Sequence, residues 1–349
     1  MRVNQAKKRY LVLEDGSVFE GCAFGAQAEQ SMGEVVFSTN MTGFTETMTD
    51  PAFEGQIVVQ TFPLIGNYGI NPADVEGAPK LKGYIVKELC QAPSHFACMG
   101  TFDTFLLEHG IPGLCGVDTR ALTKLIRNKG FVRGALTDDP KSVDPAALKG
   151  YDIGDAVSRV TVRTTLSCPV KNARHNVTVW DFGYKQSDIN ALNERGCTVT
   201  IVPAKTTAEQ VLAAKPDGVF LSTGPGDPAQ YQAIAAQIKK VCGAGVAVFG
   251  HGLGHQLLGL AHGGATQRLP YGHRGGHSVR DNALGKTDIM HQNHGYVLAL
   301  DKLPQGAVVS YTNVNDGSCE GLDYDFGFSV QFEPKAAQFD RFISMMGGK

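Results

Sequence analysis

The stretch that decides the fold runs from Val246 to Ala261 and reads VAVFGHGLGHQLLGLA. An apolar run, a glycine-rich turn and a second apolar segment are typical of a strand, a tight turn and a helix in direct succession. Many hydrolytic α/β enzymes present their nucleophile at the apex of such a turn. The apex here is Gly252, which has no side chain. The sequence therefore predicts an active-site turn that presents no reactive atom.

The segments around this turn alternate between strand and helix patterns. The expected strands are VTVWDFG, CTVTIVPA, DGVFLSTGPGDP and AGVAVFG, and the expected helices end at Arg195 or cover AEQVLAA and AIAAQIKKV. This alternation predicts a parallel, doubly wound sheet with ligands at the carboxyl ends of its strands. At one such end, Gly224 and Gly226 leave backbone N–H groups open to a carboxylate or an oxyanion. On its own, that loop is more often a plain strand-to-helix turn.

The first half of the chain has a different pattern. The segments YLVLEDGSVFEG, GEVVFSTNMTGF and GQIVVQTFPLIGNYG alternate apolar and polar residues between turn formers, which predicts a β-rich domain. We expect a helix over DTFLLEHG with Asp103 as its cap, and another over DTRALTKLIRNKG with Asp118 or Thr119 as cap and Gly130 as stop. Periodicity is lost before the polar run SCPVKNARHN. The predicted domains are therefore 1–142 and 177–349, joined by a linker over 143–176.

Composition narrows the class of protein. A length of 349 residues with 42% hydrophobic residues predicts two domains, and a net charge of -2 gives no reason to expect nucleic acid or an anionic membrane as a partner. The sequence has no apolar run of about 18 residues and no signal-peptide pattern, which predicts a cytoplasmic protein. Its eight cysteines lack zinc-type spacing, so we expect reduced, buried thiols and no metal site. There is no P-loop either.

Taken together and in this order, these segments resemble the small subunit of carbamoyl-phosphate synthetase, which hydrolyses glutamine for a larger ATP-using subunit. The resemblance covers essentially the whole chain. In the first half it rests on LVLEDGSVFEG, GEVVFSTNMTGFTETMTDPAF, IGNYGIN and DTRALTKLIRNKG, which are similar to a domain that other glutamine amidotransferases lack. In the second half it rests on WDFGYKQSDI, GCTVTIVPA, PDGVFLSTGPGDP, FGHGLGHQLLGLA, YGHRGGHSV and QNHGY. It implies a β-rich N-terminal domain and an α/β class I glutamine amidotransferase domain.

The resemblance fails at the residues that carry the family's chemistry. In the family, a cysteine thiolate attacks the glutamine amide, a histidine transfers the proton and a glutamate orients that histidine. The family's turn reads Gly-Ile-Cys-Leu-Gly-His-Gln, and its cysteine is replaced by Gly252. The late family segment Gln-Gly-His-Pro-Glu-Ala corresponds to QFEPKA, which places Glu333 at the histidine and Lys335 at the glutamate. The resemblance therefore implies a glutaminase site without its catalytic triad.

Most other positions of the family's glutamine site are kept, but Ala52 is a further departure. Ala52 stands where the family has a serine that contacts the substrate. The remaining positions that line the site by resemblance are Gly224, Gly226, Leu253, Gln256, Asn293, Gly295 and Tyr296. The last three belong to QNHGY, which could also be a surface turn. No other residue replaces the nucleophile: we expect His251 to be a polar residue at the rim and His255 to support the site from behind, while Cys242 and Cys319 lie off the predicted active loops.

Three functions remain open. The first is a carbamoyl-phosphate synthetase small subunit that pairs with a large subunit in a heterodimer but has lost glutamine hydrolysis, so that synthesis for pyrimidine and arginine formation depends on free ammonia. ATP and Mg²⁺ then belong to the large subunit, and this chain needs no cofactor. The second is a pseudoenzyme that binds L-glutamine as a regulatory or scaffold subunit. The third, ranked last, is a new activity that uses Glu333 and Lys335 as an acid–base pair.

Overall fold

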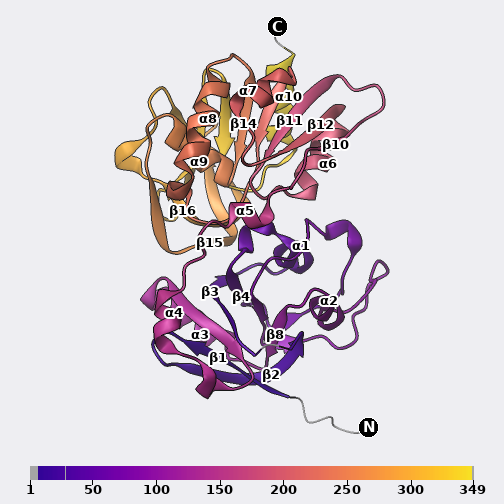
Figure 1. The fold of residues 1–349 in the computed structure, drawn as a ribbon, viewed down its shortest axis with the longest axis vertical. Helices are drawn as coiled ribbons and strands as arrows, with labels where there is room; N and C mark the ends of the chain where they lie inside the picture. Colours follow the sequence, from indigo (N-terminus) through magenta and orange to yellow (C-terminus); the bar gives the residue numbers. More distant parts are fainter. Residues whose placement is uncertain (1–6, 28, 348–349) are drawn as a thin grey trace. The chain divides into compact units, whose positions relative to one another are not determined.

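The computed structural model describes residues 7–27 and 29–347, and the chain forms two compact units that divide between Gly154 and Asp155. Figure 1 shows the first unit in indigo to magenta and the second in magenta to yellow. The division lies inside the segment expected as a linker. That segment is not irregular throughout, because it contains helices α4 (Pro145–Gly150) and α5 (Val157–Val160) and strand β10 (Leu166–Cys168).

The N-terminal unit is a closed β-barrel, which confirms the prediction of a β-rich domain. Its strands follow the order β1-β2-β8-β6-β4-β3-β9 around the barrel. They are β1 (Lys8–Leu13), β2 (Val18–Gly25), β3 (Ser31–Ser38), β4 (Gln56–Gln60), β6 (Gly83–Ile85), β8 (Pro112–Cys115) and β9 (Val132–Thr137). A short separate pair consists of β5 (Leu64–Ile65) and β7 (Glu88–Leu89). The barrel interior is filled by apolar side chains that alternate along these strands.

Three helices pack against the barrel. They are α1 (Phe44–Thr49), α2 (Phe102–Glu108) and α3 (Thr119–Lys129), with the 3₁₀ turns η1 (Pro51–Phe53), η2 (Pro72–Asp74) and η3 (Pro140–Ser142). Helices α1 and α2 pack on one apolar cluster, and α3 packs on the cluster that fills the interior. The expected ends of α3 are confirmed: the Asp118 carboxylate accepts the N–H of Ala121 at 2.9 Å, and Gly130 follows at φ 79°. The expected cap of α2 is wrong. Thr101 caps this helix, whereas Asp103 lies in its first turn and accepts the Gly25 N–H at 2.6 Å.

The C-terminal unit is built on one sheet whose order is β10-β12-β11-β13-β14-β19-β18-β17-β15-β16. The neighbours from β12 to β19 pair in parallel, as predicted, and the remaining pairs are antiparallel. The strands not yet given are β11 (His175–Asp181), β12 (Cys197–Pro203), β13 (Gly218–Leu221), β14 (Ala247–His251), β15 (Thr266–Asp281), β16 (Thr287–Leu298), β17 (Val308–Asn313), β18 (Cys319–Tyr324) and β19 (Gly327–Val330).

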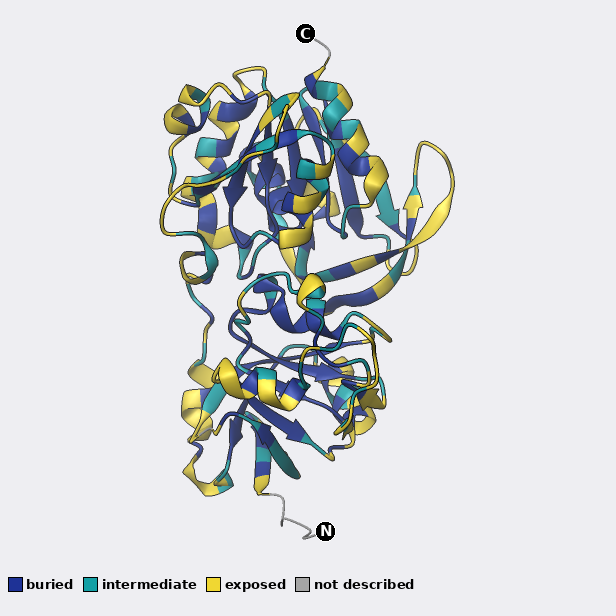
Figure 2. Cartoon of the chain, turned by 90° about the vertical axis from the view of Figure 1, so that its right-hand side faces the viewer, coloured by how far each residue is buried: buried dark blue, intermediate teal, exposed yellow. Residues whose placement is uncertain are grey.

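Helices pack on both faces of this sheet, so the doubly wound fold is confirmed. One apolar cluster joins the sheet to α7 (Ala208–Ala213), α8 (Gln232–Cys242) and α9 (Leu253–Ala261), and a second joins the other face to α6 (Gln186–Glu194) and α10 (Ala336–Met346). Two 3₁₀ turns, η4 (Pro228–Tyr231) and η5 (Leu300–Lys302), complete the unit. Figure 2 shows buried strands and helices whose outer surfaces are exposed.

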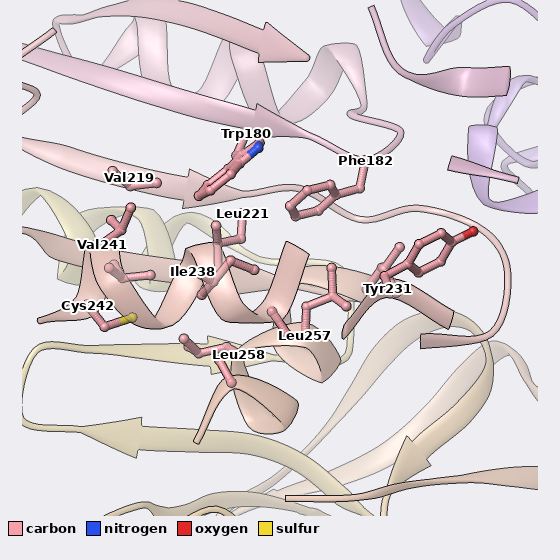
Figure 3. Packing of buried hydrophobic residues seen from close by; sticks show 14 of the residues in the cluster. Trp180, Phe182, Val219, Leu221, Tyr231, Ile238, Val241, Cys242, Leu257 and Leu258 are labelled. Atoms are coloured by element: carbon pink, nitrogen blue, oxygen red, sulfur yellow. The ribbon is translucent and has the colours of Figure 1, made fainter. Parts of the chain in front are cut away.

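The packing under α8 and α9 holds the predicted active-site turn against the sheet. Figure 3 shows Trp180 and Leu221 of the sheet facing Ile238 of α8 and Leu257 of α9, and all four are at most 1% exposed. A Cβ added to Gly254 would lie 2.2 Å from the carbonyl oxygen of Leu221, so this glycine allows α9 to approach the end of β13. Within the described residues, no helix is both long and apolar enough to span a membrane.

Candidate active site at the turn between β14 and α9

The turn that follows β14 has the geometry that the sequence predicts. β14 ends at His251, α9 begins at Leu253, and Gly252 between them adopts φ 56° and ψ -110°. Its N–H donates to the carbonyl of Val330 on the neighbouring strand at 2.9 Å, and its own carbonyl accepts the N–H of Gln256. A side chain at this residue would stand at the apex of the turn, the position where related turns display a nucleophile.

The space that a side chain on Gly252 would need is taken by Thr223. A Cβ built on Gly252 would lie 2.4 Å from the Thr223 Oγ1 atom and 3.0 Å from its Cβ. Rotation about χ1 can move the Thr223 hydroxyl, but it leaves the Thr223 Cβ in place. Thr223 is only 6% exposed and is the second residue after β13. The turn therefore has neither a nucleophile nor room for one without adjustment of this neighbour.

Two backbone donors remain beside the turn. Within residues 7–27 and 29–347, no group accepts a hydrogen bond from the N–H of Gly224 or of Leu253. Leu253 is the first residue of α9, where helical N–H groups lack intrahelical acceptors. Gly224 is required for close approach, since an added Cβ would lie 2.2 Å from the Phe182 carbonyl oxygen, and Gly226 has φ 92°. These two N–H groups can donate to a carboxylate or an amide oxygen.

The segment QNHGY lies inside strand β16, so the alternative of a surface turn is excluded. Asn293, Gly295 and Tyr296 are half-buried there. The Gln256 side chain donates from Nε2 to the Tyr296 carbonyl at 2.7 Å and to Gln331 Oε1 at 2.9 Å. Helix α9 is thus tied to β16 by the amide of a residue that the family places in the glutamine site.

Ala52 belongs to the N-terminal unit. It is the second residue of η1, and its N–H donates to the Asp50 carboxylate at 2.8 Å. Its assignment to the substrate site stays a prediction.

The residues at the positions of the family's histidine and glutamate have separate partners. Glu333 Oε1 accepts from Lys185 Nζ at 2.8 Å, and only 7% of the Lys185 side chain is exposed. Lys335 forms an ion pair with Asp288 on the surface. The two residues therefore do not form an acid–base pair with each other, which argues against the third function considered for the sequence.

His251 is a buried residue, so the expectation that it lies at a polar rim is wrong. Its Nδ1 lies 3.0 Å from Asp188 Oδ2, and its Nε2 lies 3.7 Å from Glu333 Oε2. His251 is the last residue of a strand that is buried on both faces, and Asp188 enters from the first turn of α6. We call Lys185, Asp188, His251 and Glu333 the His251 cluster.

Charge within the His251 cluster controls the protonation of the imidazole. Burial by itself lowers the pKa of His251, but the charge and hydrogen bond of Asp188, followed by the charge of Glu333, outweigh burial and raise this pKa above 6.5. The two carboxylates thus favour the protonated form of His251. Glu333 is held by its ion pair with Lys185, and the His251 ring lies on its other side.

Replacement of Asp188 by alanine is expected to lower the free energy of unfolding by about 3 kcal/mol, because it leaves a buried imidazole without its closest carboxylate. Because the pKa of His251 is raised in the folded state, its contribution to the free energy of unfolding is fully present below pH 6.5. This contribution is lost as the pH rises through the raised pKa. Asp188→Asn should flatten that fall in denaturant unfolding at several pH values. Asp340→Asn, which removes a surface ion pair with Arg195, should cost at most about 1 kcal/mol and is the control. Equal losses of unfolding free energy in Asp188→Ala and Asp340→Asn would contradict the expectation.

Cys242 and Cys319 lie outside the turn, at the end of α8 and at the start of β18. Burial raises the pKa of both the Cys242 and Cys319 thiols to about 12, so neither forms a thiolate near neutral pH. His255 also supports the site without reacting: burial, with a smaller effect of the His251 charge, lowers its pKa to about 3, and its Nδ1 lies 2.8 Å from Ser329 Oγ.

Comparison with known proteins gives the family. Residues 11–136 match the family model of the carbamoyl-phosphate synthase small chain, CPSase domain, and residues 178–338 match that of glutamine amidotransferase class-I. A solved glutamine amidotransferase from Thermotoga maritima aligns with 17% identity and a TM-score of 0.38, covering 50% of this chain and 82% of that one.

Curated relatives match over nearly the full length. The carbamoyl phosphate synthase small chain of Streptococcus agalactiae is 42% identical over 354 residues, covering 97% of this chain and 98% of the relative. That of Fusobacterium nucleatum is 44% identical over 351 residues, covering 96% and 97%. With both family models matched in order and relatives aligned end to end, this chain belongs to the family of carbamoyl-phosphate synthase small chains.

Proposed function

We propose that this chain is a carbamoyl-phosphate synthase small subunit that does not hydrolyse glutamine and that leaves its complex dependent on free ammonia. One observation carries the proposal. Gly252 lies at the apex of the turn where related enzymes have a nucleophile, and Thr223 occupies the space that a side chain there would need. The ion pair between Lys185 and Glu333 supports the proposal. Glu333 aligns with the family's histidine, and its carboxylate is already paired with the Lys185 ammonium group.

The chemistry of the missing step explains the size of the expected loss. Glutamine hydrolysis by this family requires a covalent bond between a thiolate and the amide carbon, followed by proton transfer to the leaving ammonia. Without nucleophile and base, only oxyanion donors and binding contacts remain, and loss of such a unit costs on the order of 10⁶ in rate in a serine protease. In this proposal the reaction's ATP and Mg²⁺ are bound by the large subunit, and the N-terminal unit contributes to the contact with that subunit.

The test is reconstitution with a cognate large subunit. We expect carbamoyl phosphate to form from bicarbonate, ATP and ammonium, while glutamine at the same nitrogen concentration supports less than about a thousandth of that rate. Intact mass spectrometry of the chain incubated with glutamine should show no covalent adduct. Glutamine-supported synthesis at a rate comparable to the ammonium-supported one would overturn the proposal, as would an acyl adduct on any residue of the chain.

A second candidate function is glutamine binding without turnover, in a regulatory or scaffold role. The N–H groups of Gly224 and Leu253 favour this second function. Neither donates a hydrogen bond to another described residue, so both can donate to the amide oxygen of glutamine. Binding to the folded state raises the melting temperature by mass action. Titration with L-glutamine, and with D-glutamine as the matched control, separates the two candidates: a stereospecific rise in melting temperature without ammonia release supports this second function.

A further inference from the structure

A second group of polar side chains lies outside the active-site turn, in the antiparallel part of the C-terminal sheet. His273 on β15 and His294 on β16 are directly opposite each other in the strand register, and Glu320 lies on β18. One ligand atom from each residue lies within 4.8 Å of the other two. The three side chains are 6%, 7% and 0% exposed. Their spacing in the sequence gives no sign of a site, because they come from three separate strands.

The outer nitrogen of each imidazole is already committed as a donor. His294 Nδ1 lies 2.9 Å from the Tyr296 carbonyl oxygen, and His273 Nε2 lies 2.8 Å from Asp316 Oδ2. Both oxygens only accept, so these nitrogens carry the protons. In the neutral rings, His294 Nε2 and His273 Nδ1 then present lone pairs to the interior, where Asn313 Nδ2 lies 3.4 Å from His273 Nδ1. Histidines that ligate metal ions are held in the same way, by a carbonyl or a carboxylate on the other ring nitrogen.

Both inner nitrogens face the carboxylate of Glu320. His273 Nδ1 lies 3.4 Å from Oε1, and His294 Nε2 lies 4.0 Å from Oε2. Oε1 accepts hydrogen bonds from Ser318 Oγ and Asn313 Nδ2, whereas Oε2 is buried without a hydrogen-bond partner. A doubly protonated His273 would satisfy Oε1 but would still leave Oε2 facing the lone pair of His294. Two buried acceptors in this position are costly unless a cation lies between them.

We propose that His273, His294 and Glu320 bind a divalent transition-metal ion of the Zn²⁺ class. Two imidazole nitrogens and one carboxylate oxygen form a ligand set that Zn²⁺ accepts, with a fourth position for water or another oxygen. Gln292 Oε1, 3.1 Å from His294 Nε2, is placed to supply that oxygen. Tetrahedral Zn²⁺ with bonds of about 2.0–2.1 Å needs donor atoms about 3.4 Å apart, so the ligands close in by about 1 Å on binding.

The ion has a structural role in this fold. It joins the β15–β16 hairpin to β18, and β16 also carries Asn293, Gly295 and Tyr296 of the glutamine site. Metal that binds only the folded chain adds its binding free energy to folding. The ion would therefore stabilise one wall of the site whether or not the chain hydrolyses glutamine.

The full chain, stripped with EDTA, loaded with ZnSO₄ and desalted, should retain about one Zn²⁺ per molecule by elemental analysis. Glu320→Gln and His273→Asn should each lower the retained zinc at least tenfold. His291→Asn, an exposed histidine of the same hairpin, is the matched control and should keep the wild-type content. Zn²⁺ should also raise the melting temperature of the wild type and of His291→Asn, and EDTA should reverse the rise.

X-ray absorption of zinc-loaded wild type tests the same ligands without any variant and therefore stays decisive if the substitutions prevent folding. Two imidazoles with oxygen in the remaining positions are expected. A coordination shell that contains thiolate sulfur, or only oxygen, overturns the proposal. So does wild-type protein that leaves the desalting column without zinc, or wild-type zinc content in folded Glu320→Gln and His273→Asn.

Discussion

Gly252→Cys by itself should not restore glutamine hydrolysis, and it should lower the free energy of unfolding by about 1–3 kcal/mol, the usual cost of overpacking. The new Cβ would lie 2.4 Å from Thr223 Oγ1 and 3.0 Å from Thr223 Cβ. Adding Thr223→Ala removes the contact with Oγ1 but keeps the Cβ, so it should recover only part of the lost stability. It should not recover activity, because the proton-transfer group is still missing.

Only the combination of four substitutions is expected to restore glutamine hydrolysis. With Glu333→His and Lys335→Glu added to Gly252→Cys and Thr223→Ala, ammonia release from glutamine should rise at least about 10³-fold above the wild-type chain, since nucleophile and base act as a unit. Gly252→Ala in the same background supplies the bulk without the thiol and is the control. If Gly252→Cys alone restored ammonia release, the residues Glu333 and Lys335 would not by themselves prevent hydrolysis. Equal stability of Gly252→Cys with and without Thr223→Ala would contradict the packing argument.

Acid should destabilise the C-terminal unit strongly through His255. Burial lowers the folded-state pKa of this residue to about 3 from its ordinary 6.5, so below pH 6.5 the unfolded chain takes up a proton that the folded chain refuses. Stability is therefore present above pH 6.5 and is lost as the pH falls, by about 1.4 kcal/mol per unit, or about 4 kcal/mol by pH 3.5.

His255→Gln isolates this contribution. The amide can still bond to Ser329 Oγ, which lies 2.8 Å from the imidazole, but it does not titrate in this range. In denaturant unfolding at pH 6.5 and pH 4.5, the wild type should lose about 2 kcal/mol more than the variant between the two conditions. His277, whose pKa burial lowers to about 4, contributes to both proteins and cancels in the comparison. Parallel losses in the two proteins would rule out His255 as the source.

Sequence patterns predicted those parts of the structure that depend on residues close together along the chain. The alternation of strands and helices after residue 177 predicts the doubly wound sheet, and Asp118 and Gly130 mark the ends of α3, because periodicity and capping are local properties. The cap of α2 is the informative failure. Asp103 has the right chemistry for a cap, but Thr101 lies at the turn, and the aspartate is used by Gly25 from another strand.

The absence of a side chain at Gly252 is a property of the sequence itself, and the prediction that Glu333 and Lys335 stand at the family's histidine and glutamate positions rests on the sequence alone. What surrounds those positions depends on side chains brought together from distant segments. Thr223 fills the space beside Gly252 from the end of another strand, Asp188 reaches His251 from a different helix, and Glu320 meets two histidines across three strands. No periodicity along the chain encodes such contacts, because sheet order and packing set them. The sequence therefore determined which atoms are missing from the site, and only the tertiary structure decided what occupies their place.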